Sequence, residues 1–331
     1  MQSSSELFPV ALLSAELRGD LSEDVYLLKP GNSADPTVEL ALTRLGLAAQ
    51  ENRGAPVILL HGSFSNRRFW YSPKNLGLGP FLARAGFDVW IAEMRGHGLS
   101  PRNQHYSRNT VADYARDDLP AIAAFVCEQT RQAPHWIGHS LGGITLAAAL
   151  GGHYLDERSA ASVALFGSQI SRTYWPLKVP PVEWGSRLLL KRFVHVSGSR
   201  FKRGPEDEPI GIALESLRWH RLFGRFGDAE RDWWAGLAEV KVPILAVTAD
   251  GDSQDPAWSC RKLFEQFASS QKAFLCLGKS QGFTTDFGHI EMLVSKEAQR
   301  EVWPITEHWL REQRLPEGLV DDAITNEPTY G

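Results

Sequence analysis

The chain has 331 residues, of which 43% are hydrophobic and 22% charged, and its formal net charge at pH 7 is -4. This composition is ordinary for a soluble globular protein with a substantial core, so it excludes a disordered or repetitive polymer. Because there is no basic surplus, neither nucleic acid nor an anionic membrane is expected as a partner. The three cysteines, Cys127, Cys260 and Cys276, have no CxxC spacing and are expected to be reduced thiols that form neither a disulfide frame nor a metal site.

The N-terminal part of the chain predicts an antiparallel hairpin. Its first residues, MQSSSELFPVALLSAELRGD, have no basic leader and only a short apolar run, and no later stretch reaches the length of a membrane span. We therefore expect a cytoplasmic protein without an integral membrane segment. Two strand candidates at 24–29 and 38–46 flank the turn-rich PGNSADP, which places a hairpin at the edge of a sheet.

The middle of the chain alternates between apolar strands and helix-like segments. Helix-like segments occupy 79–86, 118–132, 141–152 and 290–310, and Asp118 is the expected N-cap of the second. Continuous apolar runs of this kind suit parallel strands that are covered on both faces; they lie at 56–62, 87–93, 135–140, 162–168, 243–249 and 273–278. The alternation predicts an α/β fold with a mostly parallel central sheet flanked by helices.

The alternation of strands and helices stops between residues 169 and 240, where the sequence shows no clear strand. This stretch is rich in tryptophan, and we interpret it as an inserted helical cap, with extra helical packing on the flank of the sheet as the alternative. Residues 1–168 and 241–315 would then form the core. Residues 316–331 are expected to be a loose C-terminal tail.

Ser140 is the candidate nucleophile. It lies in GHSLG, between a predicted strand and a predicted helix, where the chain must turn sharply. Gly138 and Gly142 are needed there because side chains at these positions would collide with neighbouring elements. The hydroxyl would sit at a helix N-terminus, which favours developing negative charge.

A serine hydroxyl needs a general base, and the base needs a carboxylate to orient it. His289 is the candidate base, because it follows the last predicted strand and precedes the final helix. The acid is expected in the loop DGDSQDP. We favour Asp252 within that loop, while Asp250 could cap the strand exit and Asp255 could cap the next helix.

The oxyanion of the reaction needs two N–H donors. Leu141 follows the serine and supplies one; Ser63, or alternatively Phe64, would supply the other from the loop HGSFSN. Gly62 allows the close backbone approach. His61 precedes it and is interpreted as a structural residue that hydrogen-bonds the loop.

The chain resembles the α/β-hydrolase superfamily of serine esterases and lipases. The resemblance rests on motifs that occur in a fixed order: HG at 61–62, RGHG at 95–98, GHSLG at 138–142, the Asp252 loop and GH at 288–289. The segments GFDVWIAEMRGHGLSPRN and DYARDDLPAIAAFV are similar to the acid-lipase branch. The chain departs from that branch in having no secretory signal, Leu141 in place of the usual glutamine, and Ser63 after HG. The resemblance implies the α/β-hydrolase fold, the Ser140–His289–Asp252 triad and a preference for apolar acyl esters.

The sequence thus predicts a serine carboxylic-ester hydrolase that uses no cofactor and no metal. Its substrate would be a small-molecule or lipid-like ester beneath the tryptophan-rich cap, with ordinary core packing as the alternative role of each aromatic residue there. The oligomeric state is left open. An acyltransferase, or a thioesterase, lactonase or polyester hydrolase, would use the same triad. A non-catalytic binding member of the fold would normally have lost a triad residue, whereas all three are present here. Arg95, His97 and Asn103 either border the pocket or have structural roles.

Overall fold

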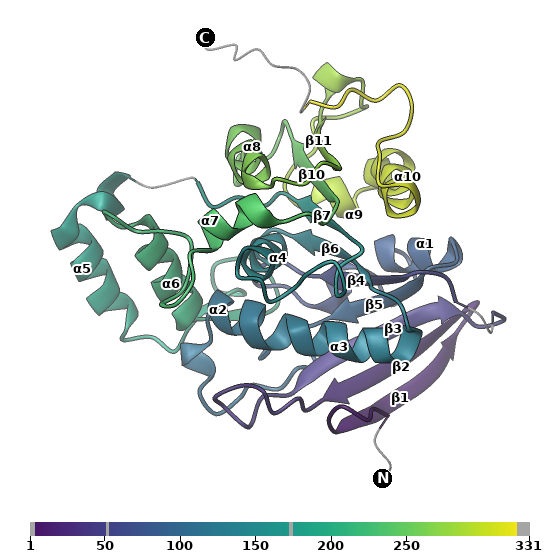
Figure 1. Cartoon of the computed structure of the whole chain (residues 1–331), viewed down its shortest axis with the longest axis horizontal. Coiled ribbons are helices and arrows are strands. Elements are labelled where there is room, and N and C mark those ends of the chain that lie inside the picture. Colours follow the sequence, from purple (N-terminus) through teal and green to yellow (C-terminus); the bar gives the residue numbers. More distant parts are fainter. Residues whose placement is uncertain (1–3, 51–52, 172–174, 323–331) are drawn as a thin grey trace.

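The computed structural model describes residues 4–50, 53–171 and 175–322, and its centre is a large twisted sheet (Figure 1). In these residues the sheet has nine strands in the order β1-β2-β3-β5-β4-β6-β7-β10-β11. The strands from β5 to β11 along this order run parallel, and β1, β2 and β3 are antiparallel. Their bounds are β1 Val10–Arg18, β2 Leu21–Leu28, β3 Leu40–Leu47, β4 Pro56–Leu60, β5 Asp88–Ala92, β6 His135–His139, β7 Ser162–Phe166, β10 Ile244–Ala249 and β11 Lys272–Leu277.

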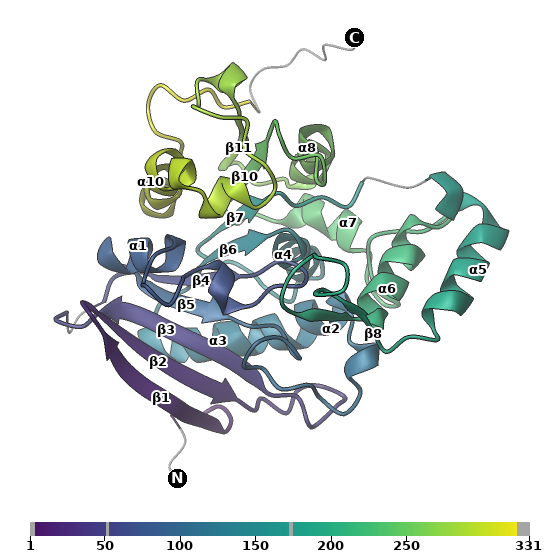
Figure 2. The same cartoon turned by 180° about the vertical axis from the view of Figure 1, so that it is seen from behind.

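Helices cover both faces of this sheet, as the alternating pattern predicted (Figures 1 and 2). One face is covered by α3 (Leu119–Thr130), α4 (Leu141–Gly151), α7 (Trp233–Gly236) and α8 (Ala257–Gln266). The other is covered by α1 (Leu78–Arg84), α9 (Glu291–Val294) and α10 (Lys296–Glu312). Every residue of β4, β5, β6, β7 and β10 is buried, because alternate side chains enter one or the other of two apolar clusters.

The antiparallel edge has one strand more than the expected hairpin. The two predicted strands are β2 and β3, but β1 pairs with β2 and forms the sheet edge. The sequence did not predict β1 because this strand has no buried face. Its residues Leu12, Leu13 and Leu17 are exposed, and only Val10 is buried.

The expected N-cap role of Asp118 is wrong. A capped helix, α2 (Val111–Asp113), continues through a π-helical turn (Tyr114–Asp118) directly into α3, so Asp118 has helical backbone angles and makes no capping hydrogen bond. Its buried carboxylate instead accepts hydrogen bonds from the guanidinium of Arg95.

The C-terminal segment is better ordered than a loose tail as far as residue 322. The carboxylates of Asp321 and Asp322 accept the N–H groups of Phe274 and Cys276 on β11, at 3.1 and 3.0 Å, and the N–H of Asp322 donates to the carbonyl of Phe274. The edge of β11 is therefore covered. Residues 323–331 of the predicted tail lie outside the described residues.

The segment between β7 and β10 leaves the sheet and forms an excursion at the side of the molecule (Figure 1). It contains α5 (Pro180–Leu190), α6 (Ile210–His220) and α7, and also a small hairpin of β8 (His195–Ser197) and β9 (Asp207–Pro209) that the sequence reading did not foresee. No helix in the described part of the chain is both long and apolar enough to cross a bilayer.

Candidate active site

Ser140 lies at the sharp turn between β6 and α4. Its backbone angles, φ 52° and ψ -119°, are unfavourable for a residue with a side chain, and such strain is characteristic of functional sites. Its N–H donates to the carbonyl of Phe166 at 2.9 Å, which ties the turn to β7. The hydroxyl is therefore presented at the first turn of α4, where unpaired N–H groups point outward.

Two glycines make this turn possible in the way the sequence predicted. A Cβ atom on Gly142 would lie 2.4 Å from the carbonyl oxygen of Leu60, and one on Gly138 would lie 2.7 Å from the backbone nitrogen of Gly143. Both distances are too short for any side chain. The helix can start this close to β4 only because both positions are glycine.

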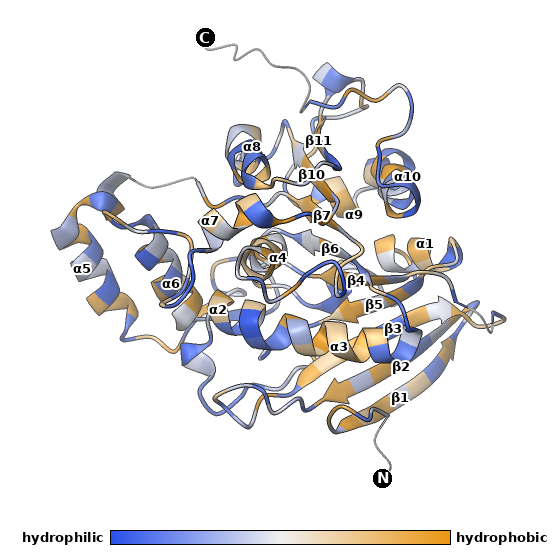
Figure 3. Ribbon diagram, viewed as in Figure 1, coloured by the Kyte–Doolittle hydropathy of each residue, from blue (hydrophilic) through white to orange (hydrophobic). Residues whose placement is uncertain are grey.

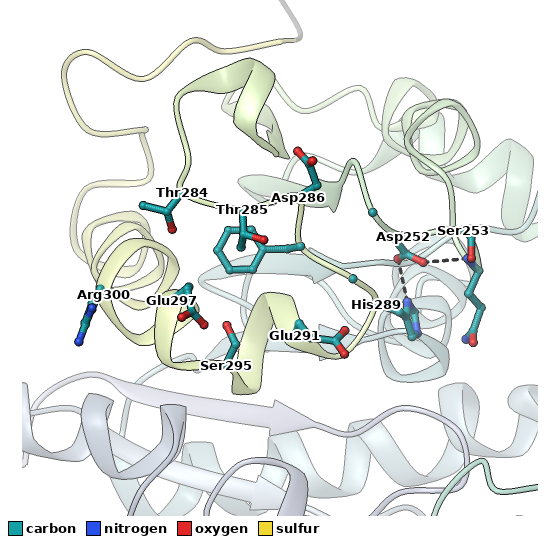
Figure 4. Close-up of a pocket in the computed structure, with 14 residues that line it drawn as sticks. Asp252, Ser253, Thr284, Thr285, Asp286, His289, Glu291, Ser295, Glu297 and Arg300 are labelled. Carbon is teal, nitrogen blue, oxygen red and sulfur yellow. Dashed lines mark hydrogen bonds and ion pairs between the residues drawn. The ribbon is translucent and has the colours of Figure 1, made fainter.

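The structure brings His289 and Asp252 together. His289 Nδ1–H donates to Asp252 Oδ2 at 2.8 Å, and the second oxygen of the buried carboxylate accepts the N–H groups of Gln254 and Asp255 (Figure 4). Asp255 Oδ2 is more distant, at 3.6 Å from the same imidazole nitrogen. Asp250 turns away and accepts the hydroxyl of Ser280 at 2.7 Å. Of the three acids left open by the sequence, Asp252 is the one that orients the imidazole.

The surroundings of His289 set its basicity. Burial opposes the imidazolium, but the hydrogen bond to Asp252 and the charges of Asp252, Asp255 and Glu291 outweigh burial and raise the pKa of His289 above its ordinary value. An imidazole held in this way accepts a proton on Nε2 more readily than a free one. This is the requirement for a general base beside a serine.

The loop after β4 offers an N–H group to the same place. A Cβ on Gly62 would lie 3.0 Å from Ser140 Cβ, so the loop backbone touches the serine. The N–H of Phe64 is already used, because it donates to Glu208 Oε1 at 2.6 Å. Within the described residues, the N–H groups of Ser63 and Leu141 donate to no protein acceptor. This favours Ser63 over Phe64 as the second oxyanion donor.

His61 is built into the loop. Its Nδ1–H donates to the carbonyl of Gly62 at 2.9 Å, and its Nε2 accepts the N–H of Met94 at 3.3 Å. Burial, together with the nearby His97, lowers the pKa of His61 to about 3, so the ring is neutral. These contacts support the structural interpretation.

Two further residues shape the site and were not singled out in the sequence. His139, the second residue of GHSLG, donates its Nε2–H to the backbone carbonyl of His289 at 2.9 Å and stacks on Phe69. Gly167 has φ +50°, and a Cβ there would lie 3.0 Å from His289 Nδ1. His139 fixes the backbone of His289, and Gly167 leaves room for its imidazole. The position of His139 inside the GxSxG motif was the one available indication.

Ser140 and His289 line one cavity of about 390 Å³. No hydrogen bond joins Ser140 Oγ to His289 among the described residues. Arg68 and Arg203 lie in the cavity wall, and no carboxylate of the part of the chain that the structure describes does. The remaining lining is Ser63, Phe64, Ser65, Asn66, Phe69, His139, Gly204, Pro205, Gln254 and Ile290.

A second cavity, of about 820 Å³, is lined by Asp252 and His289 but not by Ser140. Figure 4 shows the residues that line it. It is polar, with Glu291, Glu297 and Arg300 in its wall. Within the described residues, no group of three or more His, Cys, Asp or Glu side chains is arranged to hold a metal ion.

The tryptophans of the inserted segment do not roof the cavity around Ser140. Trp175 and Trp184 are 75% and 64% exposed, whereas Trp233 is buried in the core. Among its described residues, the segment contributes only Arg203, Gly204 and Pro205 to the lining. The expectation that its tryptophans roof the cavity is therefore wrong.

The three polar residues after β5 have structural partners. Arg95 is paired with Asp118, His97 with Glu208, and Asn103 with Asp35. All three are buried, and none lines the cavity.

Comparison with known proteins agrees with this architecture. A family model described as the alpha/beta hydrolase fold matches residues 55–201. Among solved structures, a thermophilic esterase from Thermogutta terrifontis has a TM-score of 0.55 and 21% identity, covering 85% of this chain and 96% of that one. A monoacylglycerol lipase from Paleococcus ferrophilus has a TM-score of 0.55 and 16% identity, covering 84% and 99%. At these identities the likeness concerns the fold.

Similarity in sequence extends over shorter stretches. The chain is 38% identical over 98 residues to human gastric triacylglycerol lipase, a stretch that covers 26% of this chain and 24% of the lipase. It is 33% identical over 136 residues to triacylglycerol lipase 1 of Arabidopsis thaliana, covering 38% and 34%. The match thus spans about a quarter to a third of these relatives' length. The chain has the α/β-hydrolase fold and resembles esterases and lipases of that fold.

Proposed function

We propose that the chain is a serine carboxylic-ester hydrolase that acts on apolar acyl esters. The observation that carries this proposal is the 2.8 Å hydrogen bond between His289 and Asp252 beside a strained Ser140 in a shared cavity. The local similarity to triacylglycerol lipases supports an ester substrate. Phe64, Phe69, Pro205 and Ile290 supply apolar walls for an acyl group.

In the proposed reaction, Ser140 Oγ attacks the ester carbonyl carbon while His289 Nε2 takes the hydroxyl proton. The Ser63 and Leu141 N–H groups stabilise the oxyanion, and Asp252 stabilises the imidazolium. His289 then gives the proton to the leaving alcohol as the acyl-enzyme forms. A water molecule, deprotonated by the same imidazole, releases the acid and restores the serine.

The first test compares the wild type with Ser140→Ala. We expect the wild type to react with a fluorophosphonate probe and to hydrolyse p-nitrophenyl esters, and we expect both properties to be lost in the variant. A series of acyl lengths would define the acyl preference. Absence of labelling and turnover in a folded wild type would overturn the proposal in favour of a non-catalytic binding protein.

Acyl transfer uses the same triad and is the second candidate. The Ser140 cavity has a wall of mixed character, with Arg68 and Arg203 beside the apolar residues, which is compatible with an acceptor other than water. Product analysis in the presence of an alcohol acceptor separates the two reactions. Transesterified product in excess over free acid would identify a transferase.

A further inference from the structure

Helix α5 turns its apolar side away from the protein. On a helical projection at about 100° per residue, its exposed apolar and small residues cover one continuous arc of roughly 160°. These residues are Pro181, Val182, Trp184, Gly185, Leu188 and Leu189. The opposite side carries Glu183, Ser186 and Leu190, which are half-buried. A surface helix of a globular protein normally shows the reverse orientation.

The exposed fractions make this arc unusual. Trp184 is 64% exposed, Leu188 47% and Leu189 56%. Trp175, before the helix, and Phe193, after it, are 75% and 54% exposed and extend the surface at both ends. Figures 1 and 3 show α5 at the outer limit of the molecule, with α6 between it and the sheet. A contiguous exposed apolar surface of this kind marks an interaction site.

The charges beside this surface identify its partner. Residues 175–194 contain the cations Lys178, Arg187, Lys191 and Arg192 and a single acid, Glu183. None of the four cations forms an ion pair with a described residue. Arg187 and Lys191 line a cavity of about 1010 Å³ to which α6 also contributes, whereas Lys178 and Arg192, which are exposed, do not line it. The segment is therefore locally positive in a chain whose net charge is -4. Tryptophan and leucine on one face with lysine and arginine beside them are typical of helices that lie in the interface of an anionic bilayer.

We propose that α5 docks the protein onto an anionic lipid surface. Trp184, Leu188 and Leu189 enter the interface, and the exposed cations Lys178 and Arg192, which flank the helix, contact lipid headgroups. The docking site is separate from the cavity around Ser140, to which α5 contributes no residue. The net charge of the whole chain is negative, and for that reason an anionic membrane was not expected as a partner. This net value does not reveal that the segment 175–194 is locally positive.

The test is sedimentation with vesicles, in which the Ser140→Ala variant removes any effect of catalysis. We expect binding to phosphatidylcholine vesicles that contain phosphatidylglycerol and weak binding to phosphatidylcholine alone. Binding should be lost with Trp184→Ser/Leu188→Ser and should weaken about fivefold for each cation replaced in Lys178→Gln and Arg192→Gln. Trp258→Ser, an exposed tryptophan of α8, is the matched control and should bind normally.

Failure of the Ser140→Ala protein to sediment with anionic vesicles would overturn this proposal. So would a dimer in light scattering that Trp184→Ser/Leu188→Ser dissolves, because the surface would then be occupied by a second copy. Unchanged thermal melting of the variants shows that the surface residues act outside the core. Since binding is measured without turnover, the result does not depend on the proposed enzymatic function.

A second, independent inference concerns Phe64, beside the proposed oxyanion donor. Phe64 has φ +59°, a left-handed conformation that is unfavourable for a residue with a side chain. The inserted segment holds its backbone on both sides. Glu208 Oε1 accepts its N–H at 2.6 Å, and the N–H of Glu206 donates to its carbonyl at 3.1 Å.

Glu208 is itself fixed by His97. His97 Nε2 lies 3.2 Å from Glu208 Oε1, and its Nδ1 lies 3.3 Å from the carbonyl of Arg95, so both ring nitrogens face acceptors. Burial disfavours the charged ring, but the charge and hydrogen bond of Glu208 outweigh burial and raise the pKa of His97. The other titratable neighbours are Glu206, His61 and Tyr114.

We infer that Glu208 is a positioning residue for the loop HGSFSN, which carries the proposed oxyanion donor Ser63. This inference rests on the proposed function. By holding Phe64 in its strained conformation, Glu208 aims the preceding Ser63 N–H at the substrate oxygen. The inserted segment thereby helps to assemble the site from outside the core fold. Glu208 does not touch the substrate in this role.

The test separates turnover from binding. Glu208→Ala should lower kcat by about tenfold to a hundredfold with little change in KM, because the oxyanion exists only after attack on the carbonyl. Glu208→Gln should restore most of kcat, because its amide oxygen can take the place of Oε1, which accepts the Phe64 N–H and also faces His97 Nε2. In a Phe64→Gly background, where positive φ is not strained, Glu208→Ala should cost less.

A folded Glu208→Ala variant with wild-type kcat would overturn the positioning role. Equal losses in the Ala and Gln variants would do the same, because they would show that the carboxylate charge matters and the hydrogen-bond acceptor does not. If Glu208→Ala does not fold, the comparison of Glu208→Gln with the wild type carries the test. A wild type without esterase activity would contradict the proposed function instead.

Discussion

At the scale of single residues, the relation between His289 and its acid determines how activity responds to pH. Only the neutral imidazole can accept the proton of Ser140. Since the pKa of His289 is raised, kcat/KM should fall as the pH drops through a value above that of a free histidine. A pH–rate profile of the wild type measures this acidic limb.

Replacing the acid should move that limb in a known direction. Asp252→Asn removes the hydrogen bond and charge that raise the pKa of His289, so the limb should shift to lower pH and turnover should fall by about a thousandfold or more. Asp255→Asn should shift the limb in the same direction but less, and should cost much less turnover, because its oxygen is 3.6 Å away and acts through charge alone. Asp250→Asn, whose carboxylate contacts Ser280, is the control and should leave the profile unchanged. A larger effect of Asp255→Asn than of Asp252→Asn would reverse the assignment of the acid.

Some of these residues could be predicted from sequence and others could not. GHSLG identified Ser140 because the motif and the strand-to-helix context are local along the chain. The three acids of DGDSQDP lie within six residues, and which of them faces His289 depends on how two loops pack against each other. The contact between Glu208 and Phe64 joins residues 144 positions apart, so no local pattern could reveal it.

At the scale of elements, the start of α4 depends on the absence of a side chain at Gly142. Gly142→Ala would place a Cβ 2.4 Å from the carbonyl oxygen of Leu60, so α4 or β4 must move. We expect a loss of about 1–3 kcal/mol in the free energy of unfolding, and a loss of turnover because Ser140 moves with the helix.

Gly185→Ala is the matched comparison, because no atom lies within 4 Å of the new Cβ on α5. Alanine favours the helix, so this variant should gain about 0.5–1 kcal/mol. Chemical denaturation of both variants measures the difference. A neutral Gly142→Ala would show that the contact between α4 and β4 is more adaptable than the structure indicates.

The central elements were predictable and the peripheral ones less so, for physical reasons. β4 to β7 and β10 are buried on both faces and appear as continuous apolar runs. β1 has three exposed leucines and no clear alternation, and each strand of the β8–β9 hairpin has only three residues. Their pairing is decided by partners distant in sequence rather than by local pattern.

At the scale of the whole molecule, the exposed leucines of β1 create an association risk. Leu17 is 77% exposed on an edge strand, where a charged side chain would discourage pairing between molecules. Leu17→Lys should leave the melting temperature nearly unchanged and reduce turbidity on heating. Light scattering during a thermal ramp measures this, with Leu315, a half-buried leucine, changed to lysine as the destabilising comparison. Unaltered turbidity in Leu17→Lys would assign aggregation to another surface.

The two ends of the sheet differ in a way that limits how copies of the chain can join. Asp321 and Asp322 occupy the N–H groups of Phe274 and Cys276 on β11, whereas β1, beyond Val10, pairs with no strand on its outer side within the described residues. Edge-to-edge pairing of the nine-stranded sheet is therefore expected at β1. If two copies paired through β1, the β1 edge of each copy would be hydrogen-bonded to the other. The outer edges of the joined sheet would then be the two β11 strands, which Asp321 and Asp322 cover. Growth by this route stops at a pair with twofold symmetry and does not continue into a fibre.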